Sequence, residues 1–235
     1  MTTVETSTSP TWEQIADGVD FLARPDASND IVALIAFCRL GSVVESRQDA
    51  GLVSFTGRML MRGTKRLTSA QLAETIDSLG ISISYDTAED YSYHHVTTTA
   101  DALSESVALL SETLFEPSFE PDEIEKERQV TIAAINRSED DLMSLSLKTF
   151  YEELYPNHGY GLPRIGLAES VGELTRAQIV NCHEEIAAAP FRIIAVGNFD
   201  PSDLNARLRE EFVARRGEAT NDIITILPPT PAPPH

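Results

Sequence analysis

The chain has 235 residues, of which 42% are apolar and 23% are charged, a composition typical of a folded protein with a hydrophobic core. Eighteen Lys and Arg residues stand against 37 Asp and Glu residues, so the formal net charge is −19. Phosphate backbones and anionic lipids repel such a chain, so we expect neither a nucleic acid nor a membrane as its partner.

The composition of the two ends predicts three regions. The Thr- and Ser-rich residues 1–11 indicate a flexible N-terminus. The sequence ILPPTPAPPH at the other end places a Pro-rich linker or tail at residues 227–235. Residues 12–226 between them form one predicted domain.

Apolar spacing and turn residues predict alternating strands and helices along this domain. The antiparallel hairpin is the only close strand pairing, so we expect an α+β fold, a two-layer sandwich with helices on one face of a largely antiparallel sheet. In chain order we expect strands at 20–24 and 31–39, helices at 50–61 and 69–79, a hairpin at 80–99, helices at 102–115, 121 to about 151 and 175–188, a strand at 191–196 and a helix at 202–216.

Common catalytic and metal-binding motifs do not occur in the sequence. There is no G-x-S-x-G, no glycine-rich phosphate loop, no H-E-x-x-H and no dinucleotide fingerprint. His94 and His95 are neighbours on a predicted strand and face opposite sides, so they cannot bind one ion together. Cys38 and Cys182 are far apart and indicate buried free thiols.

The sequence also lacks features that would direct the chain to a membrane or out of the cytoplasm. No apolar run approaches the ~18 residues of a transmembrane helix. The N-terminal sequence MTTVETSTSPTWEQ has neither the apolar core of a signal peptide nor the arginines of a mitochondrial transit peptide. We therefore expect a cytoplasmic location.

Six separated segments are informative when they are taken together and in order. They are GSVVE at 41–45, GLVSFTGRMLMRGT at 51–64, the hairpin at 80–94, the helix at 119–135 with EKER at 125–128, YPNHGY at 155–160 and GLAESV at 166–171. In this order they resemble the insulinase, pitrilysin and mitochondrial-processing-peptidase family of zinc metallopeptidases. The resemblance runs from about residue 17 to 225, and the second segment is similar to the family's active-site helix.

This resemblance implies a zinc ion held by the two His of H-x-x-E-H and by a distal Glu, with the Glu of the motif as general base. The chain departs from the pattern at every one of these positions, because it has Ser54, Gly57 and Arg58 in the motif and Ala134 at the distal position. The guanidinium of Arg58 brings a fixed positive charge to the metal position, where pairing with an acid would let it fill the space of the zinc. We predict that the chain binds no metal or cofactor and has no hydrolytic activity alone.

The resemblance also implies that substrate is held as an added β-strand along an exposed sheet edge. The matching edge is Ser82, Ile83, Ser84 and Tyr85, in which Ser84 and Tyr85 replace the family's usual Asn and Ala. A bulky Tyr85 would then lie where a peptide runs. The alternative interpretation is that Ile83 and Tyr85 are packing residues of the hairpin.

These observations favour a catalytically inactive subunit with a regulatory, structural or substrate-binding role in proteolysis. Active family members are implied to be clamshells of two homologous halves, and this chain resembles the first half. We therefore expect as partner an active homologue that carries H-x-x-E-H, or a second half-domain, and an extended peptide as a further ligand. Two alternatives remain open, an active zinc metalloendopeptidase with an unrecognised metal site and a stand-alone structural or peptide-binding module.

Overall fold

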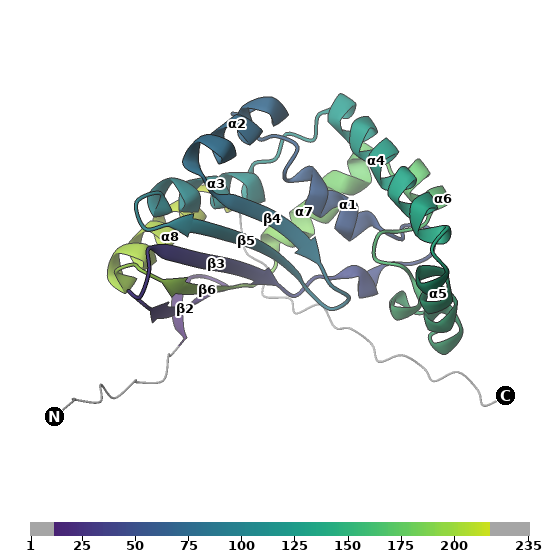
Figure 1. Ribbon diagram of the computed structural model, residues 1–235, viewed down its shortest axis with the longest axis horizontal. Coiled ribbons are helices and arrows are strands. Elements are labelled where there is room, and N and C mark those ends of the chain that lie inside the picture. The colour runs from purple at the N-terminus through teal and green to yellow at the C-terminus, as the bar shows by residue number, and fades with distance from the viewer. Residues whose placement is uncertain (1–11, 217–235) are drawn as a thin grey trace.

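One mixed sheet organises the fold of residues 12–216, which are the residues that the computed structural model describes (Figure 1). Its strand order is β1-β2-β6-β3-β5-β4, so β4 is an edge strand. Strands β2 and β6 pair in parallel, and every other neighbouring pair is antiparallel. The strands are β1 (Glu13–Ala16), β2 (Val19–Pro25), β3 (Ile31–Cys38), β4 (Ser82–Thr87), β5 (Ser92–Thr99) and β6 (Phe191–Gly197).

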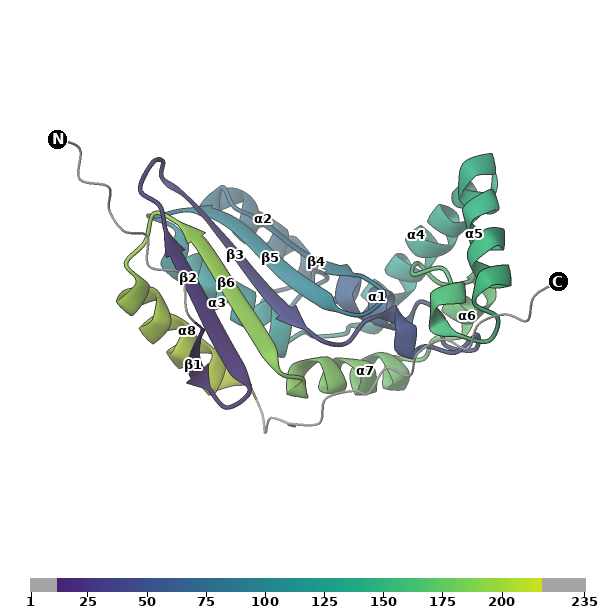
Figure 2. The ribbon, with the colours of Figure 1, turned by 90° about the horizontal axis from the view of Figure 1, so that it is seen from below.

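The helices form the second layer and one flank of the molecule. Figure 2 shows the open face of the sheet, with helices α2 and α3 behind the strands. Helices α4 and α5 stand apart at the far end, and α1 and α7 lie between them and the sheet (Figures 1 and 2). The helices are α1 (Leu52–Met59), α2 (Ser69–Leu79), α3 (Leu103–Phe115), α4 (Pro121–Glu139), α5 (Leu142–Leu154), α6 (Ala168–Glu173), α7 (Arg176–Ala188) and α8 (Pro201–Arg215), with 3-10 turns at Ser42–Val44 and Gly159–Gly161.

The side chains of the central strand β3 show why helices cover only one face of the sheet. Val32, Leu34, Ala36 and Cys38 are buried, whereas the residues between them are partly exposed. Successive strand residues point to opposite faces, so this alternation marks one face that packs against helices and one that faces outward. The predicted α+β architecture, with helices on one face of the sheet, is confirmed.

One strand pairing was not expected, and one predicted helix is wrong in detail. The sheet has a parallel pair, β2–β6, which the sequence did not indicate because its two strands are far apart in the chain. The single helix predicted from 121 to about 151 is two helices, because α4 ends at Glu139 and α5 begins at Leu142. The carboxylate of Asp141 accepts a hydrogen bond from the backbone N–H of Ser144 at 2.9 Å and so caps the new helix.

Parts of the predicted domain division lie outside the described residues, namely the N-terminus at 1–11, the tail at 227–235 and the domain end at 226. Within residues 12–216, no helix has both the length and the apolar character needed to cross a membrane.

His94 is a buried polar group in the helix-facing side of the sheet. It is fully buried, and neither of its ring nitrogens has a hydrogen-bond partner. Its neighbour His95 points to the other face, where its Nδ1 lies 2.9 Å from the Ser84 hydroxyl. Loss of water, and to a smaller extent the nearby His95, lowers the pKa of His94 to about 3. The folded protein therefore holds His94 neutral.

We predict that acidification destabilises the protein through His94. The folded pKa lies below the unfolded value, so the stabilisation is present above pH 6.5 and is lost as the pH falls toward 3. Linkage gives a loss of about 2 kcal/mol by pH 5 from this group. Urea unfolding at pH 7.5 and pH 5 should show a smaller pH dependence for His94→Leu than for the parent protein. An equal pH dependence in both proteins would show that His94 does not remain neutral in the fold.

Candidate functional site

Helix α1 carries the motif positions and lies between edge strand β4 and helix α4, both of which it contacts. The chain enters the helix at Gly51, which has a left-handed backbone with φ of 91°. A Cβ at Gly51 would lie 2.6 Å from Cα of Gly166, so the chain passes too close to another segment for any side chain. The close contact between Gly51 and Gly166 fixes where α1 begins.

A buried carboxylate holds the first turn of α1. Glu45 accepts hydrogen bonds from the backbone N–H groups of Gly51 and Val53, each at 2.7 Å, and so satisfies two donors of the helix N-terminus. Loss of water raises the pKa of Glu45 to about 8, and these two hydrogen bonds oppose that rise. Glu45 thus acts as a remote cap, supplied by the G-S-V-V-E segment.

Five side chains from α1, its C-terminal extension and α4 form what we call the Arg58 cluster, namely Ser54, Arg58, Arg62, Glu127 and Thr131. Arg58 donates from Nε to Oε1 of Glu127 at 2.8 Å, from Nη1 to Oγ of Ser54 at 2.8 Å and from Nη2 to Oγ1 of Thr131 at 3.3 Å. Arg62 donates from Nε and Nη2 to Oε2 of Glu127, at 2.9 and 2.5 Å. One carboxylate thus holds two guanidinium groups.

The charged side chains of the Arg58 cluster differ in how far they are exposed to solvent. The Glu127 side chain is only 4% exposed, whereas those of Arg58 and Arg62 are 31% and 33% exposed. A buried carboxylate needs compensating charge, and the two arginines supply it from the wetter side. Burial lowers the pKa of Arg58 and Glu127 opposes that change, but a guanidinium remains protonated at neutral pH.

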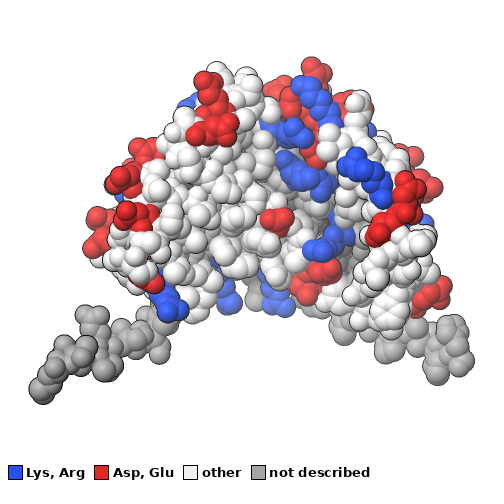
Figure 3. Space-filling model, in the orientation of Figure 1, with Lys and Arg blue, Asp and Glu red and all other residues white. Residues whose placement is uncertain are grey.

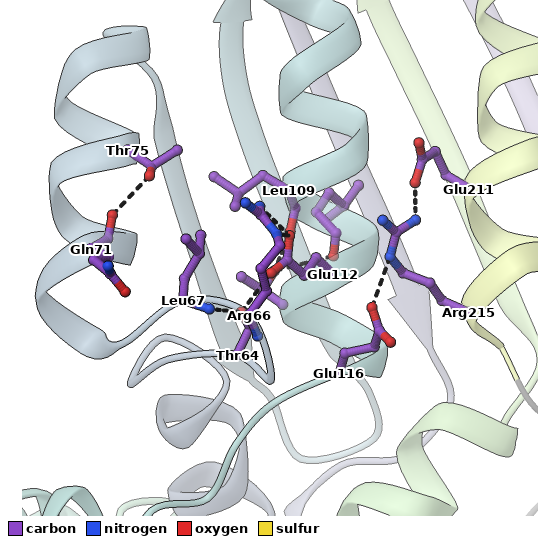
Figure 4. Close-up of polar contacts among 12 residues, drawn as sticks. Thr64, Arg66, Leu67, Gln71, Thr75, Leu109, Glu112, Glu116, Glu211 and Arg215 are labelled. Atoms are coloured by element: carbon purple, nitrogen blue, oxygen red, sulfur yellow. Dashed lines mark hydrogen bonds and ion pairs between the residues drawn. The ribbon is translucent and has the colours of Figure 1, made fainter.

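A second buried glutamate makes a comparable contact with the segment that follows α1, outside the motif positions. Figure 4 shows Glu112 of α3 facing the loop after α1, where its Oε1 accepts from the Thr64 hydroxyl at 2.5 Å and its Oε2 from Nη2 of Arg66 at 2.6 Å. Arg66 is 67% exposed. The segment around α1 is therefore tied to α4 by Glu127 and to α3 by Glu112.

Gly57 stands where the resemblance places the general base, and packing closes the space around it. A Cβ added at Gly57 would lie 2.2 Å from Cδ1 of Tyr85, a separation that side-chain carbons do not adopt. Tyr85 is buried, and its ring also packs edge-on against His94 at 5.8 Å between centroids. The tyrosine ring therefore occupies the space that any side chain at position 57 would need.

A cleft of about 400 Å³ opens beside this site, between the end of edge strand β4 and helix α1. In Figure 3 basic side chains gather over the middle and right of this face, along the hollow between the sheet and helices α4 and α5, with acidic groups among them. The cleft is lined by Ser54, Arg58, Tyr85, Asp86, Thr87, Arg164 and Ile165.

The structure brings most of the predicted site residues together. Ser54, Gly57 and Arg58 share α1, and Ala134 lies on α4, one turn beyond Thr131 and partly buried. The predicted peptide-binding residues Ser82, Ile83, Ser84 and Tyr85 fall on edge strand β4, and peptide binding there remains a prediction.

The orientation of the strand answers one question that the sequence left open. Ile83 and Tyr85 are buried on the helix-facing side of β4, whereas Ser82 is exposed and Ser84 partly so. The ring of Tyr85 packs into the core against Gly57. Both residues therefore pack as hairpin residues.

The residues at the motif positions do not fit a zinc ion. A serine hydroxyl, a guanidinium and a methyl group replace the two imidazoles and the distal carboxylate, and the guanidinium repels a cation. Among residues 12–216, no group of three His, Cys, Asp or Glu side chains is arranged to hold a metal.

Sequence reasoning missed the partners of Arg58. Glu127 was recognised within E-K-E-R, but 69 residues separate it from Arg58, so the sequence did not identify it as the acid that pairs with the cation. Nothing in the sequence indicated that Thr131 contacts Arg58, except that Thr131 lies one helical turn from Glu127. Arg62 lies in the second of the six segments, but nothing there identified it as a partner of Glu127, and Arg164 lies in none of the segments.

We predict that Glu127→Gln destabilises the fold by about 2 kcal/mol, because two guanidinium groups then share a partly buried site without a counter-charge. Glu125→Gln on the same helix is the matched control, since Glu125 is 58% exposed and its partner Arg128 also donates to the backbone carbonyls of Val171 and Leu174. The control should change the free energy of unfolding by less than about 0.5 kcal/mol. Equal effects in urea unfolding would contradict a central role for Glu127.

Comparison with known proteins yields a consistent set of relatives. The family described as Insulinase (Peptidase family M16) matches residues 21–166. An uncharacterized zinc protease of Mycobacterium tuberculosis (strain CDC 1551) is 28% identical over 177 residues, covering 75% of this chain and 40% of that protein. The mitochondrial-processing peptidase subunit beta of Dictyostelium discoideum is 26% identical over 218 residues, covering 86% of this chain and 46% of that protein.

Solved structures share the fold at lower identity. A peptidase M16 inactive domain from Pseudomonas fluorescens has a TM-score of 0.83 at 20% identity, covering 94% of this chain and 55% of that one. The first half of the periplasmic protease PqqL from Escherichia coli has a TM-score of 0.80 at 22% identity, covering 93% and 49%. This chain spans half or less of the length of the curated relatives named here. By its sequence match and its fold, it belongs to the insulinase family, peptidase family M16.

Proposed function

We propose that this chain is a non-hydrolytic half of a peptidase assembly and pairs with a half that carries an intact H-x-x-E-H. The observation that carries the proposal is the guanidinium of Arg58, which stands at the second His position and is bonded to Glu127, Ser54 and Thr131. A cation held by three protein acceptors leaves no place for a metal ion at this position.

The packing of Tyr85 supports the same proposal from the side of the general base. A metallopeptidase of this kind needs a carboxylate at position 57 to activate water. The ring of Tyr85 leaves no room there for even a Cβ atom. Loss of the ligands and loss of the base are therefore both supported by physical contacts.

Helix α5 supports the pairing. None of its residues is buried, and three large apolar side chains on it, Leu142, Met143 and Phe150, are more than half exposed. Exposed apolar area of this kind marks an interaction surface. The named relatives and solved structures are about twice the length of this chain, so a second half-domain is the partner that we propose.

In the proposed substrate-binding role, the peptide binds at edge strand β4. Strand β4 has no strand partner on its outer side within the described residues, and the cleft beside α1 adjoins its C-terminal end. An unpaired edge offers backbone N–H and C=O groups to an extended peptide. We propose that the chain holds peptide along β4 while the partner half supplies the chemistry.

We predict that Gly57→Glu destabilises the protein by about 3 kcal/mol, because the new side chain collides with the ring of Tyr85. Adding Tyr85→Ala should recover about 2 kcal/mol relative to the sum of the two single changes. Gly172→Glu in α6 is the control, since nothing lies within 4 Å of a Cβ at that position. A Gly57→Glu protein as stable as its parent in urea would contradict the packing argument.

We predict that affinity purification of the tagged chain from its native host recovers an H-x-x-E-H homologue in equal amount, or finds this chain within a longer polypeptide that contains such a half. Zinc analysis should find the metal in the complex and none in the chain alone. Stoichiometric zinc in the isolated chain, with peptide hydrolysis that a chelator stops, would favour the active metallopeptidase. A monomer without a partner would favour the stand-alone module.

A further inference from the structure

Two guanidinium groups line the cleft at the end of β4, in a protein whose net charge is −19. They belong to Arg58 and Arg164, and the only carboxylate among the lining residues is that of Asp86. Most of the surface of so acidic a protein repels anions, so a cleft whose lining carries two guanidinium groups and one carboxylate is a selective place for one. Because Arg164 is paired with Glu89 at 3.2 Å, the attraction for an anion rests mainly on Arg58.

Arg58 is held in place and still has donors to offer. Its bonds to Glu127, Ser54 and Thr131 use three of its five N–H groups, which leaves one hydrogen on each terminal nitrogen. Its side chain is 31% exposed. Because Glu127 is shared with Arg62, the three charged groups of the Arg58 cluster carry a net charge of about +1.

Other donors lie around the same cleft. Ser54 accepts its bond from Arg58, and its own hydroxyl hydrogen has no acceptor within the described part of the chain. Arg164 donates from Nη1 to the backbone carbonyl of Thr87 at 3.2 Å, and its Nε lies 3.2 Å from Oε1 of Glu89. These contacts place the half-exposed Arg164 guanidinium at the end of β4, and no hydrogen bond within residues 12–216 uses its Nη2 hydrogens.

We propose that this cleft binds a carboxylate group of an extended peptide that lies along β4. A carboxylate matches the planar donor edge of a guanidinium and gains charge-assisted hydrogen bonds from it. The proposal rests on the peptide-holding role proposed above and adds the chemical class of the ligand. The group can come from an Asp or Glu side chain or from the C-terminus of the peptide.

The test measures binding of fluorescein-labelled nonapeptides by anisotropy, with the complete chain at low ionic strength. The first peptide has capped ends, neutral β-prone residues and one central Glu, and the second has Gln in place of that Glu. A third peptide has Gln at the centre and a free C-terminal carboxylate. The protein variants are Arg58→Gln and, as the matched control, Arg66→Gln, whose side chain is directed to Glu112 outside the cleft.

The Glu peptide should bind about tenfold more tightly than the Gln peptide, and this preference should weaken as salt is added. Arg58→Gln should remove the preference and leave the affinity for the Gln peptide unchanged, whereas Arg66→Gln should keep it. Tighter binding of the third peptide than of the Gln peptide would identify the C-terminus as a source of the carboxylate. If Arg58→Gln does not fold, Arg164→Gln replaces it, because that side chain is 54% exposed.

Three results would overturn the proposal. Equal affinity for the Glu peptide and both neutral-centred peptides would show that the cleft does not select carboxylates, although peptide holding by β4 would stand. A preference that survives in Arg58→Gln and Arg164→Gln would place the carboxylate elsewhere. Failure of all three peptides to bind would remove both this inference and the peptide-holding role, but it would leave the pairing with a second half to be judged by co-purification.

Discussion

One buried carboxylate, that of Glu127, determines how helix α1 sits against helix α4. It accepts from Arg58 with one oxygen and from Arg62 with the other, so both of its oxygens are used in joining the two helices. The cleft wall formed by Ser54 and Arg58 depends on this contact, because the same guanidinium that bonds Glu127 also lines the cleft. A buried charge is costly without partners, and here each partner also positions part of the site.

The replaced motif positions are physically consistent with one another. Ser54 is small and accepts a hydrogen bond from Arg58, and Gly57 leaves the space that the Tyr85 ring fills. Loss of metal ligands without compensation would leave Glu127 unpaired in the interior and a void beside β4. Neither is present, because the residues at these positions are packed against and hydrogen-bonded to their neighbours.

The parts of this arrangement that were predictable from sequence are those set by local spacing. The helices predicted at 69–79 and 175–188 are α2 and α7, which Thr68 and Thr175 cap, and Gly80 ends α2 in a left-handed conformation. Strand alternation also places Tyr85 on the same face as Ile83, although the sequence left open whether that face is turned inward. The pairing of β2 with β6 and of Arg58 with Glu127 joins distant segments, and no local pattern specifies such contacts.

In the proposed non-hydrolytic role, Arg58 keeps the sign of charge that a zinc site would have but does not supply its chemistry. A zinc ion on this helix would be a positive centre that also polarises water and carbonyl groups. Arg58 is likewise a positive centre beside edge strand β4, but a guanidinium binds oxygen only through hydrogen bonds and does not generate hydroxide at neutral pH. A positive centre that attracts oxygen through hydrogen bonds alone fits the proposed role of holding a peptide without cleaving it.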